Sequence, residues 1–265
     1  MKTSRLIVGL MALALLLPSL AAAQNPNGFP LRSVCAARSN TNGDCQQDAI
    51  NDSVCVEGVV IAWKHFAARG PGAIYDPSSG CCISIFDIDL EADQPIGTIV
   101  RVCGWTGPFN GLDELVDDPT DGTPNPTVTV LGSGGATPVT LVSALDVADA
   151  APGAEALESC LVKVCGTFEA TGNYGSNVNL VFRDAFNNPC TVRIDGDTNI
   201  DGTPIPAGQV TVTGILGQFD TTPLMTPCVG YQILPRELGD ITAADCATVG
   251  VESRTWSTVK SIYED

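Results

Sequence analysis

The chain has 265 residues, of which 30 are acidic and 13 are basic, so its formal net charge is −17. A charge of this sign repels polyanions and disfavours nucleic-acid binding, which relies on Lys and Arg displacing the counterions of phosphate. A single histidine and the absence of a C-x-x-C pair also argue against a Cys/His zinc site.

Residues 1–23 are predicted to be a signal peptide. Lys2 and Arg5 precede an apolar stretch at 6–17, and small residues at 21–23 form a cleavage site before Gln24. The apolar stretch is shorter than the roughly 20 residues that a spanning helix needs. We therefore expect a mature chain without a membrane span, secreted or held at the cell surface or in the periplasm. All 11 cysteines follow the cleavage point, which favours disulfide bonds.

The mature sequence contains an internal duplication. Gly58 and Cys82 are 24 residues apart, and so are Gly166 and Cys190. Gly104 precedes Phe109 by five residues, as Gly214 precedes Phe219. Matching intervals of this kind indicate two copies of one structural unit.

Each copy is rich in β-branched residues arranged in short runs between Gly- and Pro-containing turns, which is typical of β-strands. The glycines at strand ends mark the sharp bends of a small barrel. We therefore predict an all-β protein of two tandem OB-fold-like five-stranded β-barrels with little helix. An irregular N-terminal arm is expected at 24–52, barrels at 53–140 and 159–245, and a linker at 141–158. The tail, 246–265, is expected to contain a short amphipathic helix.

The run from Gly208 to Asp220, followed by Gly230 to Arg236, resembles the second barrel of secreted bacterial proteins with tandem OB-fold domains. The runs Val56 to Val60 and Phe109 to Leu115 resemble the first barrel. The resemblance implies the fold and the arrangement of the barrels. It implies little about function, since the family is mostly uncharacterised.

A calcium site is one hypothesis for the second copy. Asp195 precedes the run Asp197, Asn199 and Asp201, whose alternate oxygens and following glycine match the first half of a calcium loop. The residue at position twelve is Gly208, where such a loop needs Glu. The alternative is a polar turn between two strands.

A ligand-binding face is a second hypothesis, because OB barrels stack extended ligands on aromatic side chains. The alternative is that these aromatic residues fill the barrels. The candidate ligand-binding residues are Trp63, Lys64, His65, Phe66, Arg69, Trp105, Tyr174, Arg183 and Tyr231.

The disulfide candidates are Cys35, Cys45, Cys55, Cys103, Cys165, Cys190, Cys228 and Cys246. Cys55 and Cys103 are expected on neighbouring strands. The further predicted pairings link Cys35 with Cys45, Cys165 with Cys190, and Cys228 with Cys246. The odd cysteine count leaves one thiol over, and the adjacent Cys81 and Cys82 make one of these two the candidate.

No catalytic constellation is apparent, because the single His65 has no evident Ser or Cys partner. The sequence therefore favours a non-catalytic exported binding or structural module for extracellular interaction, surface association or assembly. The alternative is nucleic-acid or oligosaccharide binding through the OB face. The negative net charge disfavours nucleic-acid binding. A protein partner or self-assembly stays open, and calcium is the only cofactor that the sequence suggests.

Overall fold

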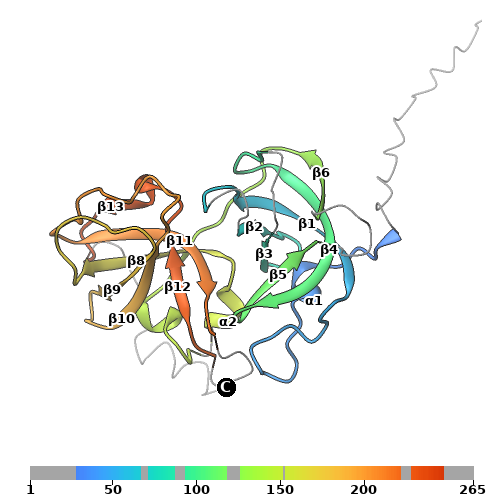
Figure 1. Cartoon of the computed structure of the whole chain (residues 1–265), viewed down its shortest axis with the longest axis horizontal. Coiled ribbons are helices and arrows are strands. Elements are labelled where there is room, and N and C mark those ends of the chain that lie inside the picture. The colour runs from blue at the N-terminus through green and yellow to red at the C-terminus, as the bar shows by residue number, and fades with distance from the viewer. Residues whose placement is uncertain are drawn as a thin grey trace, which may run out of the picture.

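The computed structural model describes residues 28–66, 71–86, 93–117, 126–151, 153–221 and 228–247. These residues form an all-β protein of two closed five-stranded barrels that lie side by side (Figure 1). The predicted signal peptide, the predicted tail helix and Arg69 lie outside the described residues. No helix within the described ranges is both long enough and apolar enough to cross a membrane.

The first barrel has the strand order β1-β2-β3-β5-β4, and β4 closes it by pairing with β1. All neighbours are antiparallel except β3 and β5. This is the strand order of the OB fold, and β6 adds a further strand to β4. The strands are β1 (Ser53–Ala62), β2 (Gly72–Tyr75), β3 (Cys82–Ile85), β4 (Ile99–Phe109), β5 (Leu112–Val116) and β6 (Thr127–Gly132).

The second barrel repeats this order as β8-β9-β10-β12-β11, with β11 closing onto β8. The short strands β7 and β13 extend its sheet. The boundary expected at residue 140 therefore falls within β7, which pairs with β8. The strands are β7 (Thr140–Leu141), β8 (Leu161–Phe168), β9 (Val178–Asp184), β10 (Pro189–Ile194), β11 (Val210–Gln218), β12 (Tyr231–Leu234) and β13 (Ile241–Ala243).

The glycines that revealed the duplication occupy equivalent positions in the two barrels. A Cβ on Gly58 would lie 2.9 Å from the carbonyl oxygen of Tyr75, and one on Gly166 would overlap the carbonyl oxygen of Arg183. Glycine is required at these two positions because the backbone of the neighbouring strand approaches too closely for any side chain.

The N-terminal arm and the linker are not merely connections, because each caps the barrel that follows it. Helix α1 (Val34–Ala37) buries Val34 and Ala37 in the core of the first barrel. The 3₁₀ helix η2 (Ala144–Val147) and helix α2 (Ala154–Leu157) contribute Ala144, Val147 and Ala154 to the core of the second. A second 3₁₀ helix, η3 (Leu238–Asp240), precedes β13. The repeated unit is thus a cap followed by a barrel.

The two barrels share a continuous apolar contact, which we call the seam. Its buried members from the first barrel are Ile61, Ala62, Phe66, Ala73 and Cys82, and those from the second are Cys160, Leu161, Ile215 and Leu234. The outer face of strands two and three is where OB barrels bind extended ligands. In the first barrel this face is buried against the second.

Five disulfides join ten of the 11 cysteines: Cys35–Cys81, Cys45–Cys228, Cys55–Cys103, Cys82–Cys160 and Cys165–Cys246. Disulfides in this number place the chain in an oxidising extracellular or periplasmic environment. Cys82–Cys160 ties β3 of the first barrel to the segment that enters β8. Cys45–Cys228 ties the N-terminal arm to the second barrel.

The predicted pairing of Cys55 with Cys103 is confirmed, since the two residues lie directly opposite each other on β1 and β4. The other three predicted pairings are wrong, and so is the prediction that Cys81 or Cys82 is free. Successive residues of an extended segment point to opposite sides. Cys81 therefore reaches the arm while Cys82 reaches the other barrel.

The free cysteine is Cys190, which had been a disulfide candidate. Its side chain lies among the apolar residues inside the second barrel and is 7% exposed. Burial, with the nearby Asp184 carboxylate, raises the pKa of the thiol to about 12. The thiol is therefore neutral and packs as a small apolar group.

Candidate ligand site between the barrels

The aromatic residues predicted to form a ligand platform are mostly structural. Trp63 lies in the core of the first barrel and Tyr174 in that of the second. Phe66 packs in the seam, and the Tyr231 hydroxyl donates to Glu155 Oε2 over 2.7 Å. All four side chains are buried, as the alternative of barrel-filling aromatic residues expects.

The remaining candidates are not brought together. Lys64 and His65 lie in the turn after β1, where His65 Nδ1 accepts from the backbone amide of Trp63. Trp105 is half-buried on β4 of the first barrel, whereas Arg183 lies on β9 of the second. The predicted residues that the structure describes therefore do not share a single surface.

The predicted calcium loop forms a turn after β10. Asp195 Oδ1 accepts the backbone amide of Asp197 over 2.9 Å, and Asn199 Oδ1 accepts that of Leu238 over 2.7 Å. The carboxylates of Asp195, Asp197 and Asp201 do not converge within 4.8 Å. The turn interpretation, which the sequence left open, fits this geometry.

A pocket of about 130 Å³ lies beside the seam and draws on both barrels. The first barrel contributes residues of β3, β4 and β5, and the second contributes residues of β10, β11 and β12. The lining residues are Pro71, Ser84, Phe86, Phe109, Leu112, Glu114, Arg193, Ile215, Gly217, Gln218, Phe219, Gln232 and Leu234. Pockets of this kind, largely apolar with a few polar groups, are typical ligand sites.

The two copies present equivalent positions to this pocket. Phe109 and Phe219 are the repeated phenylalanines of the sequence, and their side chains are 49% and 51% exposed. Glu114 pairs with Ser84 across the parallel contact of β5 with β3. The register of β12 and β11 makes Gln232 the counterpart of Glu114 in the second copy. The duplication therefore builds one shared site from two similar halves.

Aromatic rings form one wall of the pocket. The rings of Phe86 and Phe109 stack with centroids 5.7 Å apart and planes inclined by 10°. Phe219 lines the pocket from the second barrel. Half-exposed phenylalanines at the edge of a pocket offer apolar faces and quadrupoles to a ligand.

Glu114 is the buried acid of the pocket. Its side chain is 1% exposed, and its Oε2 atom has no hydrogen-bond partner. Burial raises the pKa of Glu114 well above its usual value, and the neighbouring Asp113 carboxylate raises it further. An unpaired acid in this position is costly for the folded state.

Gln218 supplies a second unpaired oxygen. Its Nε2 donates to the carbonyl of Val229 over 2.8 Å, which fixes the orientation of the amide and leaves Oε1 without a partner. The amide also packs against Gly111, where a Cβ would come within 2.8 Å of the Gln218 side chain. Two of the residues that line the pocket thus carry a buried acceptor oxygen without a hydrogen-bond partner.

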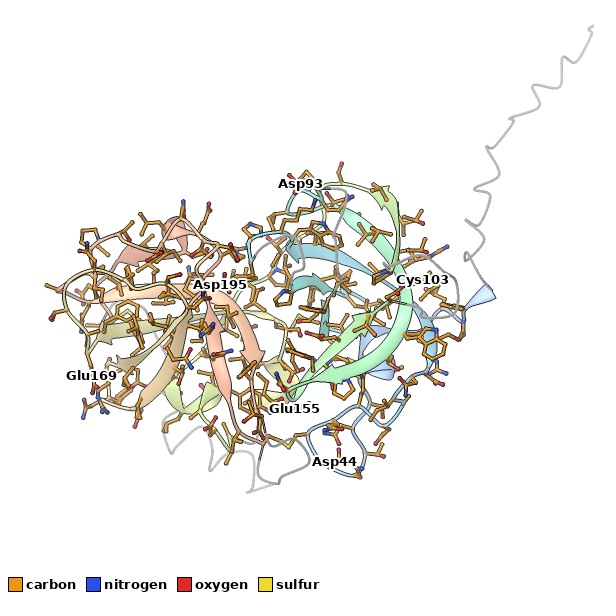
Figure 2. All side chains as sticks on the ribbon, in the orientation of Figure 1. Asp44, Asp93, Cys103, Glu155, Glu169 and Asp195 are labelled. Carbon is orange, nitrogen blue, oxygen red and sulfur yellow. A yellow bond between two sulfur atoms is a disulfide. The ribbon has the colours of Figure 1, made fainter. Side chains whose placement is uncertain are left out.

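Behind the pocket, Arg38 of the N-terminal arm holds a group of three acids where the barrels meet. Its guanidinium lies 3.3 Å from Asp113, 3.6 Å from Glu155 and 2.9 Å from Glu158. It also donates to the carbonyl of Cys82 over 3.0 Å. Figure 2 places Glu155 at the junction of the two barrels.

These acids form the one group of three within 4.8 Å that the described residues offer to a metal ion. Arg38 already supplies a positive charge and hydrogen bonds there, so the arrangement is an ion-pair network that fastens the arm. Burial raises the pKa of Asp113 to about 6, while Arg38 opposes this shift. Burial also raises the pKa of Glu158, which Arg38 again opposes.

No family model matches the chain, and no curated protein matches it.

The sequence reasoning missed Glu114, Gln218 and the Phe109–Phe219 pair as site residues. One signal was available for the acid. Asp113 and Glu114 stand side by side between leucines in a strand, so their side chains point to opposite faces. In a barrel that packs against a second body, both faces are buried.

Proposed function

We propose that the chain is a non-catalytic exported binding module that binds a small group in the pocket between its two barrels. The observation that carries the proposal is the unpaired Glu114 carboxyl in a pocket with aromatic walls. The seam, two disulfides between the parts and the Arg38 network hold both halves of the pocket in fixed positions. A site preorganised in this way loses little conformational entropy on binding.

The test is ligand-observed NMR with the mature protein and three probes: butylammonium, methyl glucoside and adenosine monophosphate. The variant Phe109→Ala/Phe219→Ala removes both exposed ring faces of the pocket. Phe186→Ala is the matched control, since Phe186 is 71% exposed and does not line the pocket. We expect at least one probe to bind the wild type and the control but not the double variant. Binding that survives in the double variant, or failure of all three probes, contradicts the proposal.

Nucleic-acid or oligosaccharide binding is a second candidate function, favoured by the open outer face of β9 and β10. Arg183 and Arg193 lie on this face, opposite the side chains that fill the barrel. Arg183 pairs with Glu169, and Arg193 donates to the carbonyl of Asn177. The outward positions of these two strands carry no aromatic residue for stacking.

Fluorescence anisotropy of a labelled single-stranded oligonucleotide, titrated with mature protein at low salt, tests the nucleic-acid part of this candidate. Binding that weakens as salt rises and is lost in Arg183→Ala/Arg193→Ala would support it. Binding that the double variant retains, or no binding at all, would rule out this face. Titration of a neutral oligosaccharide into the wild type and into Arg183→Ala/Arg193→Ala tests oligosaccharide binding at the same face.

A further inference from the structure

The pocket between the barrels lacks donors rather than acceptors. Glu114 Oε2 and Gln218 Oε1 are both buried and unpaired, and both residues line the same pocket. The two oxygens do not satisfy each other, and the amide hydrogens of Gln218 are directed to Val229. Buried acceptors without partners are rare in folded proteins and call for an explanation. A ligand that donates several hydrogen bonds would satisfy both.

The charge around Glu114 favours a cation. The adjacent Asp113 is also acidic, and the Arg38 guanidinium is used by Asp113 and Glu158. Arg193 is the one basic residue of the pocket lining, and its guanidinium is directed to Asn177 and to Asn179 Oδ1. The whole chain carries a net charge of −17, which concentrates cations near its surface.

The walls fit an ammonium group on an apolar stem. The stacked Phe86 and Phe109 rings and the Phe219 ring present faces to which a cation is attracted. Leu112, Ile215 and Leu234 add aliphatic surface for methylene groups. The volume of about 130 Å³ is below the roughly 300–1,000 Å³ of a pocket that encloses a drug-sized ligand. The pocket therefore suits one short group.

We infer that this pocket binds a primary ammonium group on a short aliphatic stem, with Glu114 Oε2 and Gln218 Oε1 accepting its N–H donors. A primary ammonium offers three such donors and no acceptor, whereas a quaternary ammonium offers none. When the cation enters, the Glu114 carboxyl ionises and its proton passes to solvent, so the buried acid gains its counter-charge. The ammonium comes from a free alkylamine or from a lysine side chain of a protein partner.

This inference rests on the proposed function, and isothermal titration of the mature protein with matched probes separates the two. The probes are butylammonium, tetramethylammonium, which cannot donate, and butanol, which is uncharged. Glu114→Gln keeps the shape of the side chain and removes its charge. Glu237→Gln is the control, because Glu237 is exposed and lies outside the pocket.

We expect butylammonium to bind the wild type and Glu237→Gln equally, and Glu114→Gln at least tenfold more weakly. Tetramethylammonium and butanol should bind at least tenfold more weakly than butylammonium to the wild type. A peptide containing one lysine, compared with the same peptide acetylated at that lysine, separates the two sources. If the unmodified peptide binds more tightly than butylammonium, the ligand is a lysine side chain of a protein partner. If butylammonium binds more tightly than the peptide, the ligand is a free amine.

The inference is overturned if tetramethylammonium binds as tightly as butylammonium. It is also overturned if Glu114→Gln binds butylammonium as tightly as the wild type does. Binding of butanol or methyl glucoside that depends on Phe109 and Phe219 but not on Glu114 also overturns it. That last result would leave the proposed function intact, because the pocket would still be a binding site.

Discussion

Asp76 and Asp184 make the same contact in the two barrels, 18 residues after Gly58 and Gly166 respectively. Asp76 Oδ2 accepts the backbone amide of Val34, the first residue of α1, over 3.0 Å. Asp184 Oδ2 accepts that of Ala144, the first residue of η2, over 3.1 Å. Asp76 directly follows β2, and Asp184 is the last residue of β9, so both stand at the end of the second strand of their barrel. The caps are therefore part of the duplicated unit and are fastened in the same way.

Replacing either aspartate by asparagine should destabilise its barrel. Asp76→Asn removes a carboxylate that also accepts from Ser78 and Ser79, and a hydrogen bond to a charged group contributes about 1.5–3 kcal/mol. Asp184→Asn should cost a similar amount. Denaturation in urea measures both changes. Asp197→Asn, at an exposed position of a turn, is the control and should change stability by less than about 0.5 kcal/mol. Equal effects in all three variants would contradict a capping role.

The Cys82–Cys160 disulfide should contribute more to the coupling of the barrels than a disulfide within one barrel. Removing a native disulfide from a small domain costs about 2–5 kcal/mol. Because this bond crosses the seam, Cys82→Ala/Cys160→Ala should also separate the unfolding of the two barrels into two transitions. Calorimetry detects this separation. Cys55→Ala/Cys103→Ala, within the first barrel, should leave the barrels unfolding together. A single transition in the first variant would contradict this role and show that the seam, the Cys45–Cys228 disulfide and the Arg38 network suffice to couple the barrels.

Cys190 should be the one thiol of the chain and should be unreactive in the folded protein. It lies inside the second barrel, and the raised pKa of its thiol leaves almost no thiolate at neutral pH. Labelling with iodoacetamide followed by peptide mapping should modify no cysteine in native buffer and only Cys190 in denaturant without reductant. Labelling of any other cysteine in denaturant would contradict the disulfide pattern.

The sequence predicted the two barrels because their glycines are imposed by backbone contacts that recur in both copies. The β1–β4 and β8–β11 registers place Gly58 opposite Val100 and Gly166 opposite Val210. Positions fixed by such close approach tolerate only glycine, so the repeat survives in the sequence. Helix α1 of the first cap escaped prediction because a four-residue helix leaves no periodic pattern to detect.

The equal spacing of Cys82 and Cys190 from Gly58 and Gly166 does not make the two cysteines structurally equivalent. Tyr75 pairs with Cys82 across the first hairpin, whereas Arg183 pairs with Pro189 across the second. The first turn is one residue longer, so Cys190 corresponds in space to Ile83 and points into its barrel. A shift of one residue exchanges the two faces of a strand. The alternation of the two strands carries this shift, because Cys82 is in phase with the polar Ser84 whereas Cys190 is in phase with Val192 and Ile194. The sequence does not show which acids the seam buries, because that depends on how the two barrels pack.

Stability should fall as the pH rises from about 4 towards neutrality. Glu114 and Asp113 have raised pKa values in the folded state, about 6 for Asp113, whereas an unfolded Glu or Asp titrates near 4. Between these limits the folded chain binds more protons than the unfolded chain, so the free energy of unfolding decreases with pH. Glu114→Gln removes one of the acids. It should therefore raise stability at pH 7 and make the pH dependence shallower, because the pKa of Glu114 is raised in the folded state. Urea denaturation between pH 4 and pH 8 measures both effects. Glu237→Gln should keep the wild-type profile, and a loss of stability at pH 7 in Glu114→Gln would show that the carboxyl is paired in the folded protein.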